Sequence, residues 1–244
     1  EIDKAELVRL ADVIEEVTRH NDEWHFYLAQ RTLSDYIGDL SSTYLDVLKD
    51  RLYADAPASL ERRSAQTVLA EILSALVRML APVLAFTSDE TWGFMPGWLT
   101  EGLESVHLSE WPVAHTTGLD GDTLRTKYAM LREVREVVTK ALEEARNEKH
   151  ISKSQEAKIV VSAPEEYAAI LNGTSTETLC ELFIVSGVEV ESGEILEARV
   201  EMADGEKCPR CWNYRELGQV EGHEDVCTRC ARVLDEIGFE AESE

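Results

Sequence analysis

The most constraining feature of the sequence is a pair of Cys-x-x-Cys motifs near its carboxyl end. Cys208 and Cys211 form the first motif, and Cys227 and Cys230 form the second after fifteen intervening residues. Two such turns can direct four sulfur atoms at one point, as in tetrahedral structural zinc sites. Because four thiolates leave no position open for water, we expect one structural Zn²⁺ that stabilises about thirty residues poor in apolar side chains.

Other chemistry uses cysteines at the same spacing. Two disulfides, a redox-active dithiol pair or a rubredoxin-like iron centre would each fit the paired motifs, although the spacing favours zinc. The fifth cysteine, Cys180, lies between leucines on a predicted helix, where a small buried thiol is expected. His223 lies within the module but exceeds the four sulfur ligands, so we expect it in a surface loop.

Hydrophobic periodicity divides the rest of the chain into a helical part and a mixed part. Apolar residues recur at helical spacing up to Pro82, where a long helix should end before a loop-rich stretch. A second long helix is predicted from about residue 122. β-Branched and alternating residues at 157–161 and 188–202 predict strands, the latter as a hairpin that turns at Ser192.

These patterns predict a mainly α protein in four parts. The expected parts are a helical bundle with a loop-rich end at residues 1–121, a long helix plus a small α+β unit at 122–203, a four-cysteine zinc knuckle at 204–234 and an acidic mobile tail at 235–244.

Charge narrows the classes of partner. The chain carries 24 basic and 48 acidic residues, a net charge of −24. No global positive field therefore attracts nucleic acid, and any phosphate contact must be local. The cysteine module, with five basic and six acidic residues, is the least acidic part.

An apolar content of 44% excludes a disordered chain. The apolar runs are shorter than the roughly 20 residues of a membrane span, so no membrane is expected as a partner.

Aromatic and basic residues beside the first motif offer such a local contact. Arg210 lies within the motif, and Trp212 and Tyr214 follow it. The indole of Trp212 is either a lid over a small core or a platform on which an unpaired base stacks, and the residue pattern leaves both open. Basic side chains of the helical half offer phosphate contacts or are merely solvated; they are Lys49, Arg51, Arg62 and Arg63.

Short motifs along the chain point to a known family. They are Tyr-Leu-Asp at 44–46, Lys-Asp-Arg at 49–51, Arg-Arg-Ser-Ala-Gln-Thr at 62–67, Leu-Ala-Pro at 80–82 and Ser-Asp-Glu-Thr-Trp at 88–92. This set resembles the anticodon-binding helical domain of class I aminoacyl-tRNA synthetases for isoleucine, valine, leucine and methionine. The long helix, Lys-Ser-Gln-Glu-Ala at 153–157 and the knuckle at 206–214 follow in an order that resembles the carboxyl-terminal region of bacterial isoleucyl-tRNA synthetases.

The resemblance implies a class I synthetase-type helical bundle and a zinc module that bind the anticodon arm of tRNA(Ile). Arg210 and Trp212 match the positions best placed to meet anticodon bases. The resemblance also implies a cytoplasmic and monomeric parent enzyme that joins isoleucine to tRNA using ATP, and the remainder of that parent chain is an expected partner.

We expect no catalytic residue in this chain. The sequence shows neither a nucleotide-binding fold nor an editing insertion, and His-Ile-Ser-Lys-Ser at 150–154 only imitates the family's ATP-binding loop. Because this segment follows the helical part instead of preceding it, we interpret it as a connector. The chain opens on Glu1 without an apolar leader, so we expect a piece of a longer protein.

Two other functions fit parts of the pattern. Formamidopyrimidine-type DNA-repair glycosylases end in a similar four-cysteine knuckle. They need a proline amine at the mature amino terminus and a β-rich front, whereas this chain starts with Glu1 and predicted helices. A noncatalytic protein-interaction module with structural zinc would suit the acidic composition. The synthetase interpretation predicts binding to RNA, whereas the interaction-module interpretation predicts binding to proteins.

Overall fold

The computed structural model describes residues 1–238 and divides into two compact units. The first unit holds residues 1–46 and 60–125, and the second holds residues 47–59 and the chain from residue 126 onward. The fold is mainly α, as expected. Among the residues described, no helix has the length and apolar character needed to cross a membrane.

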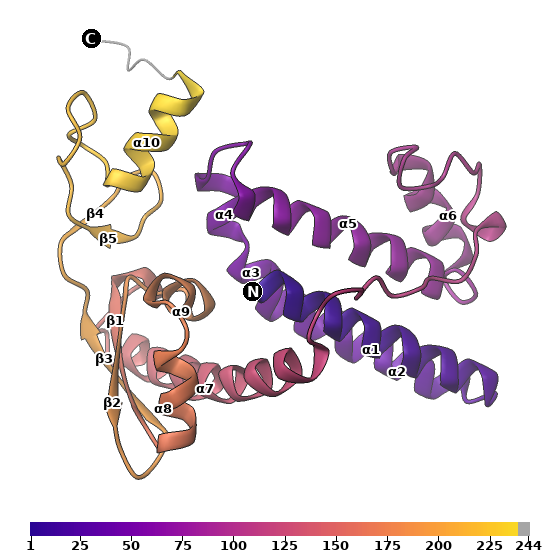
Figure 1. Cartoon of the computed structure of the whole chain (residues 1–244), viewed down its shortest axis with the longest axis horizontal. Coiled ribbons are helices and arrows are strands. Elements are labelled where there is room, and N and C mark those ends of the chain that lie inside the picture. Colours follow the sequence, from indigo (N-terminus) through magenta and orange to yellow (C-terminus); the bar gives the residue numbers. More distant parts are fainter. Residues whose placement is uncertain (239–244) are drawn as a thin grey trace. The chain divides into compact units, whose positions relative to one another are not determined.

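Helices build the first unit (Figure 1). They are α1 (Ile2–Asp22), α2 (Phe26–Asp39), α3 (Leu45–Val47, which ends on the first residue of the second unit), α5 (Leu60–Leu80) and α6 (Ala85–Phe94), with a π-helical turn η1 (Leu40–Tyr44) and a 3₁₀ turn η2 (Val106–Leu108). α1 packs against α2 and α5, and α5 packs against α6. Buried apolar residues recur along α1 at helical spacing, from Val8 to Val17. α5 ends two residues before Pro82, as predicted.

Two buried carboxylates on α1 accept hydrogen bonds from tyrosines. Tyr44 Oη donates to Asp3 Oδ1 at 2.8 Å, and Tyr36 Oη donates to Glu6 Oε1 at 2.9 Å. Both acids are only 5% exposed, and buried polar atoms without partners cost about 1–3 kcal/mol each. These hydrogen bonds therefore fix α1 against α2 and the turn that follows it.

The second unit combines helices with a three-stranded sheet. Its helical elements are α4 (Lys49–Ala54), α7 (Gly121–Asn147, continuing from the first unit), η3 (Ser154–Glu156), α8 (Glu165–Asn172), α9 (Thr176–Phe183) and α10 (Thr228–Ile237). Strand β1 (Ala157–Ala163) lies at the centre of the sheet, parallel to β2 (Gly187–Ser192) and antiparallel to β3 (Glu197–Met202). Helices α8 and α9 connect β1 to β2.

The predicted hairpin of residues 188–202 is wrong. β2 and β3 follow one another in the chain, but β1 pairs with both and separates them. The reason lies in side-chain burial: Ile159, Val160 and Val161 of β1 are all at most 1% exposed. A strand that is apolar on both faces belongs in the middle of a sheet. The half-exposed strands β2 and β3 accordingly lie at its edges.

The carboxyl-terminal part of the second unit is small. Strand β4 (Glu206–Lys207) pairs antiparallel with β5 (Tyr214–Arg215), and α10 follows after a long loop (Figure 1). The expected acidic tail began at residue 235, but residues 235–237 belong to α10. Gly238 follows as the C-cap of this helix, and residues 239–244 of that predicted tail lie outside the described residues.

Candidate metal centre and nucleic-acid interface

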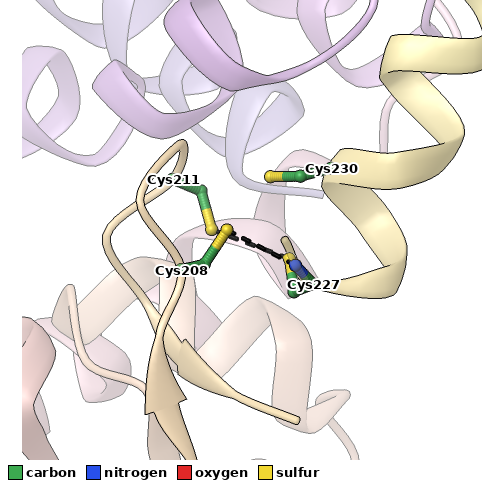
Figure 2. A group of neighbouring side chains, drawn as sticks. All are labelled: Cys208, Cys211, Cys227 and Cys230. Atoms are coloured by element: carbon green, nitrogen blue, oxygen red, sulfur yellow. Dashed lines mark hydrogen bonds between the residues drawn. The ribbon is translucent and has the colours of Figure 1, made fainter. Parts of the chain in front are cut away.

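Four cysteine side chains converge in the knuckle (Figure 2). Cys208 and Cys211 lie on the turn between β4 and β5, Cys227 is the N-cap of α10, and Cys230 lies in its first turn. All four sulfur atoms lie within 4.8 Å of one another, and the sulfurs of Cys211 and Cys227 are 3.8 Å apart. Zn–S bonds near 2.3 Å in a tetrahedron place sulfur atoms about 3.8 Å apart, so the cysteines fit this metal.

Backbone hydrogen bonds shape the first metal-binding turn. The amide of Trp212 donates to the carbonyl of Cys208 at 2.8 Å, and the amide of Cys208 donates to the carbonyl of Asn213 at 3.0 Å. The amide of Cys227 donates to the sulfur of Cys208 at 3.5 Å, which joins the two motifs. The amino end of α10 adds its positive dipole beside the sulfurs, and this favours thiolates.

The cysteine sulfurs share negative charge through hydrogen bonds. Hydrogen bonds from Cys211 and Cys230 lower the pKa of Cys227, and the bond to Cys227 raises the pKa of Cys211 to about 11. None of the five cysteines forms a disulfide. A bound Zn²⁺ would be held by Cys208, Cys211, Cys227 and Cys230, would replace their protons and would leave no position for a substrate. This ion therefore supplies structure and no chemical step.

Two arginines inside the motifs contact the segment 47–59. Arg210 Nη1 donates to the carbonyl of Ala54 at 2.5 Å and lies 3.5 Å from the sulfur of Cys230. Arg229 pairs with Asp50 at 2.5 Å and with Asp55 at 3.2 Å. Each arginine stands between two metal-binding cysteines in the sequence. The metal-binding turns therefore hold α4 and its flanking residues in place.

The other basic residues singled out from the sequence lie in different surroundings. Arg51 forms a bidentate ion pair with Glu181, and its side chain is only 11% exposed. Lys49 and Arg63 are exposed, and Arg62 is partly buried. Lys49 and Arg51 belong to the second unit with the knuckle, whereas Arg62 and Arg63 belong to the first unit.

Trp212 is half-exposed and adopts a left-handed backbone conformation. Its φ is 66° and 52% of its surface is exposed, so it is not a closed lid over the knuckle. Tyr214 lies on β5 opposite Lys207. The ammonium groups of Lys153 and Lys207 lie 4.8 and 5.6 Å from the centre of the Trp212 ring. Sequence reasoning missed Lys153, because 59 positions separate it from Trp212 and no local pattern joins them.

A second group of metal-binding residue types lies in the turn between α1 and α2. Ligand atoms of His20, Glu23 and His25 lie within 4.8 Å of one another. The guanidinium of Arg19 already contacts Glu23 at 3.3 Å and His20 at 3.4 Å. This positive charge occupies the carboxylate that a cation would need, and we assign no metal there.

Two known protein families match parts of this sequence. Residues 3–161 match the family described as the anticodon-binding domain of tRNA ligase. The chain belongs to this anticodon-binding family. A second family, described as a zinc finger found in FPG and IleRS, matches residues 205–233. Together with the four-cysteine cluster, this match confirms one structural zinc ion in the knuckle.

The relatives that the chain matches are isoleucine–tRNA ligases. The chain is 41% identical to the isoleucine–tRNA ligase of Natranaerobius thermophilus over 96% of its own length and 27% of the relative's. Identity is also 41% to the isoleucine–tRNA ligases of Syntrophotalea carbinolica and Kosmotoga olearia, over 96% and 99% of this chain. The chain thus spans about a quarter of the length of these relatives. The predicted resemblance to isoleucyl-tRNA synthetases is confirmed. The glycosylase interpretation is not favoured, because the anticodon-binding match covers the helical half.

Proposed function

We propose that this chain binds the anticodon arm of tRNA(Ile) as part of a larger synthetase that joins isoleucine to this tRNA using ATP. The observation that supports the proposal best is the half-exposed, left-handed Trp212 on a metal-binding turn, in a chain of the anticodon-binding family. The chemistry of aminoacylation belongs to the remaining part of the larger protein. The unpaired thiols of the knuckle suit a reducing compartment, and we place the function in the cytoplasm.

Unpaired anticodon bases expose the faces and edges that such a surface can read. Stacking of a base on an aromatic side chain contributes about 1–3 kcal/mol. In the proposal Trp212 supplies the stacking surface, Tyr214 extends it, and exposed Lys49 contacts phosphate. Arg62 and Arg63 offer phosphate contacts on the first unit.

Arg51 and Arg210 have a different part in the proposed function. Both are already engaged inside the second unit, Arg51 with Glu181 and Arg210 with the carbonyl of Ala54. We assign them to holding the α4 segment and the metal-binding turn in position. Arg210 lies two residues before Trp212, so its contact with Ala54 also orients the proposed stacking surface.

The test is binding of the zinc-loaded chain to a tRNA(Ile) transcript and to the same transcript with a substituted anticodon, at low salt. We expect preference for the native anticodon, and loss of most of this preference in Trp212→Ala. Trp98→Ala removes an exposed indole that belongs to the first unit, and this variant should retain the preference for the native anticodon. Equal binding of the wild-type chain to both transcripts would rule out anticodon recognition.

A further inference from the structure

Two lysines from separate segments converge on the exposed indole of Trp212. Lys153 lies in the connector before η3, and Lys207 lies on β4. Their ammonium nitrogens are 4.8 and 5.6 Å from the centre of the indole ring. This group of three side chains, Lys153, Lys207 and Trp212, is named here the Lys–Trp cluster.

Hydrogen bonds explain how the connector reaches the knuckle. The amide of Tyr214 donates to Ser186 Oγ at 2.7 Å, and this hydroxyl donates to the carbonyl of Gln155 at 2.6 Å. The amide of Ser186 also donates to the carbonyl of Ala157 at 3.0 Å. Ser186 therefore ties the β4–β5 pair to the connector, and Lys153 is two residues from one of these bonds. The Lys–Trp cluster is thus a built feature of the second unit.

The Lys–Trp cluster carries two positive charges, those of its lysines. Within residues 1–238, neither Lys153 nor Lys207 has a carboxylate partner. Nearby Lys158 shows the alternative, since it pairs with Glu189 at 2.7 Å. In a chain with twice as many acidic as basic residues, two unpaired ammonium groups beside an exposed aromatic ring form a local site for an anion that also carries a flat ring.

We propose that the Lys–Trp cluster is a nucleotide site for single-stranded RNA, in which an unpaired base stacks on the indole of Trp212 and Lys153 and Lys207 bind the adjoining phosphodiesters. This inference rests on the proposed function and adds the groups that bind the backbone. The four-carbon stems of the lysines let the ammonium groups move from the ring to phosphate oxygens as the base arrives. Because the lysines contact only phosphates, they supply affinity and register, and selection of the anticodon rests with the base bound at Trp212 and with other contacts.

The test measures binding of a short unstructured oligoribonucleotide and of the tRNA(Ile) transcript as a function of salt. Each phosphate contact to single-stranded nucleic acid contributes about 0.7 to the slope of log affinity against log salt concentration. We expect Lys153→Gln and Lys207→Gln each to reduce this slope by about 0.7. Trp212→Ala should instead lower affinity about fivefold or more at every salt concentration without changing the slope.

Lys140→Gln is the matched control. Lys140 is exposed on α7 in the same unit, and its loss changes the net charge by the same amount. It should leave the slope unchanged. Zinc content and the circular dichroism spectrum of each variant are measured to show that the knuckle remains folded.

The outcomes separate this inference from the proposed function. Slopes for Lys153→Gln and Lys207→Gln equal to that of Lys140→Gln would overturn the nucleotide site, even if the wild-type chain still distinguished anticodons. Absence of oligoribonucleotide binding at low salt, or binding of an acidic peptide in its place, would overturn it too. A reduced slope without anticodon preference would support the nucleotide site while removing the proposed function.

Discussion

At the scale of single residues, the surroundings of each cysteine decide its chemistry. Cys208, Cys211, Cys227 and Cys230 face one another and share hydrogen bonds. Cys180 lies alone on α9, only 8% exposed, and burial raises the pKa of its thiol to about 11. Thiolate is the reactive form of cysteine, so the two kinds of cysteine differ in reactivity as well as in metal binding.

Thiol counting at pH 8 checks this difference. A pKa near 11 leaves about one thiolate in a thousand at Cys180 at this pH, and burial also limits access to it. We expect almost no rapid alkylation in the zinc-loaded chain, four rapidly reacting thiols after chelation and a fifth only after denaturation. In Cys180→Ser the fifth thiol should disappear and the four rapid ones should remain. Rapid labelling of Cys180 in the folded wild-type chain, read by mass spectrometry, would contradict the assignment.

At the scale of secondary-structure elements, metal-binding turns and α4 form one packed group through Arg210 and Arg229. Substitution of Arg229 should disturb this group more than substitution of Arg210, because Arg229 pairs with two carboxylates, those of Asp50 and Asp55. Removing the guanidinium of Arg229 takes one ion-pair partner from each of these two carboxylates. The stability of α4 is thereby coupled to the knuckle.

Arg229→Met should lower the free energy of unfolding of the zinc-loaded chain by about 1–2 kcal/mol, since its partners are partly solvated and the full cost of a buried unpaired charge does not apply. Arg232→Met is the matched control, because Arg232 is an exposed arginine three residues further along α10. Urea denaturation at fixed zinc concentration measures both. Equal stability of the two variants would show that the pairs with Asp50 and Asp55 contribute nothing.

Elements also show what could be read from the sequence and what could not. The zinc knuckle was predictable because each pair of cysteines is local and its spacing encodes the turn. The end of α5 before Pro82 was predictable because proline ends a helix through its own local geometry. The central place of β1 was missed, since pairing of β1 with both β2 and β3 is decided by burial across distant segments. The Lys–Trp cluster depends on Ser186 bridging two segments, which leaves no mark in the local sequence.

At the scale of the whole molecule, the two units differ in what holds them together. The first unit has long helices with apolar faces and the buried tyrosine–carboxylate bonds of α1. The knuckle of the second unit has only a small apolar cluster around its cysteines, with Val226 and Ala231 among its members. Zinc binding energy therefore replaces a hydrophobic core in that part of the chain.

Removal of zinc should unfold the knuckle and spare the first unit. Hydrogen exchange read by mass spectrometry should show loss of protection at residues 206–237 and at 47–59, which Arg210 and Arg229 contact. Peptides from α1 and α5 should keep their protection. Because the ligands must be deprotonated, the affinity of the knuckle for zinc should fall as the pH is lowered. Full protection around Trp212 in metal-free protein would contradict a structural role for the ion.

The central position of β1 has a consequence for synthesis on the ribosome. β1 emerges before β2 and β3; one of its backbone edges stays open until β2 has been made and the other until β3, which ends at Met202, has been made. An apolar strand with a free edge is prone to pair with a strand of another chain. During translation β1 is therefore the part of the second unit most prone to pair with strands of other nascent chains made from the same messenger RNA.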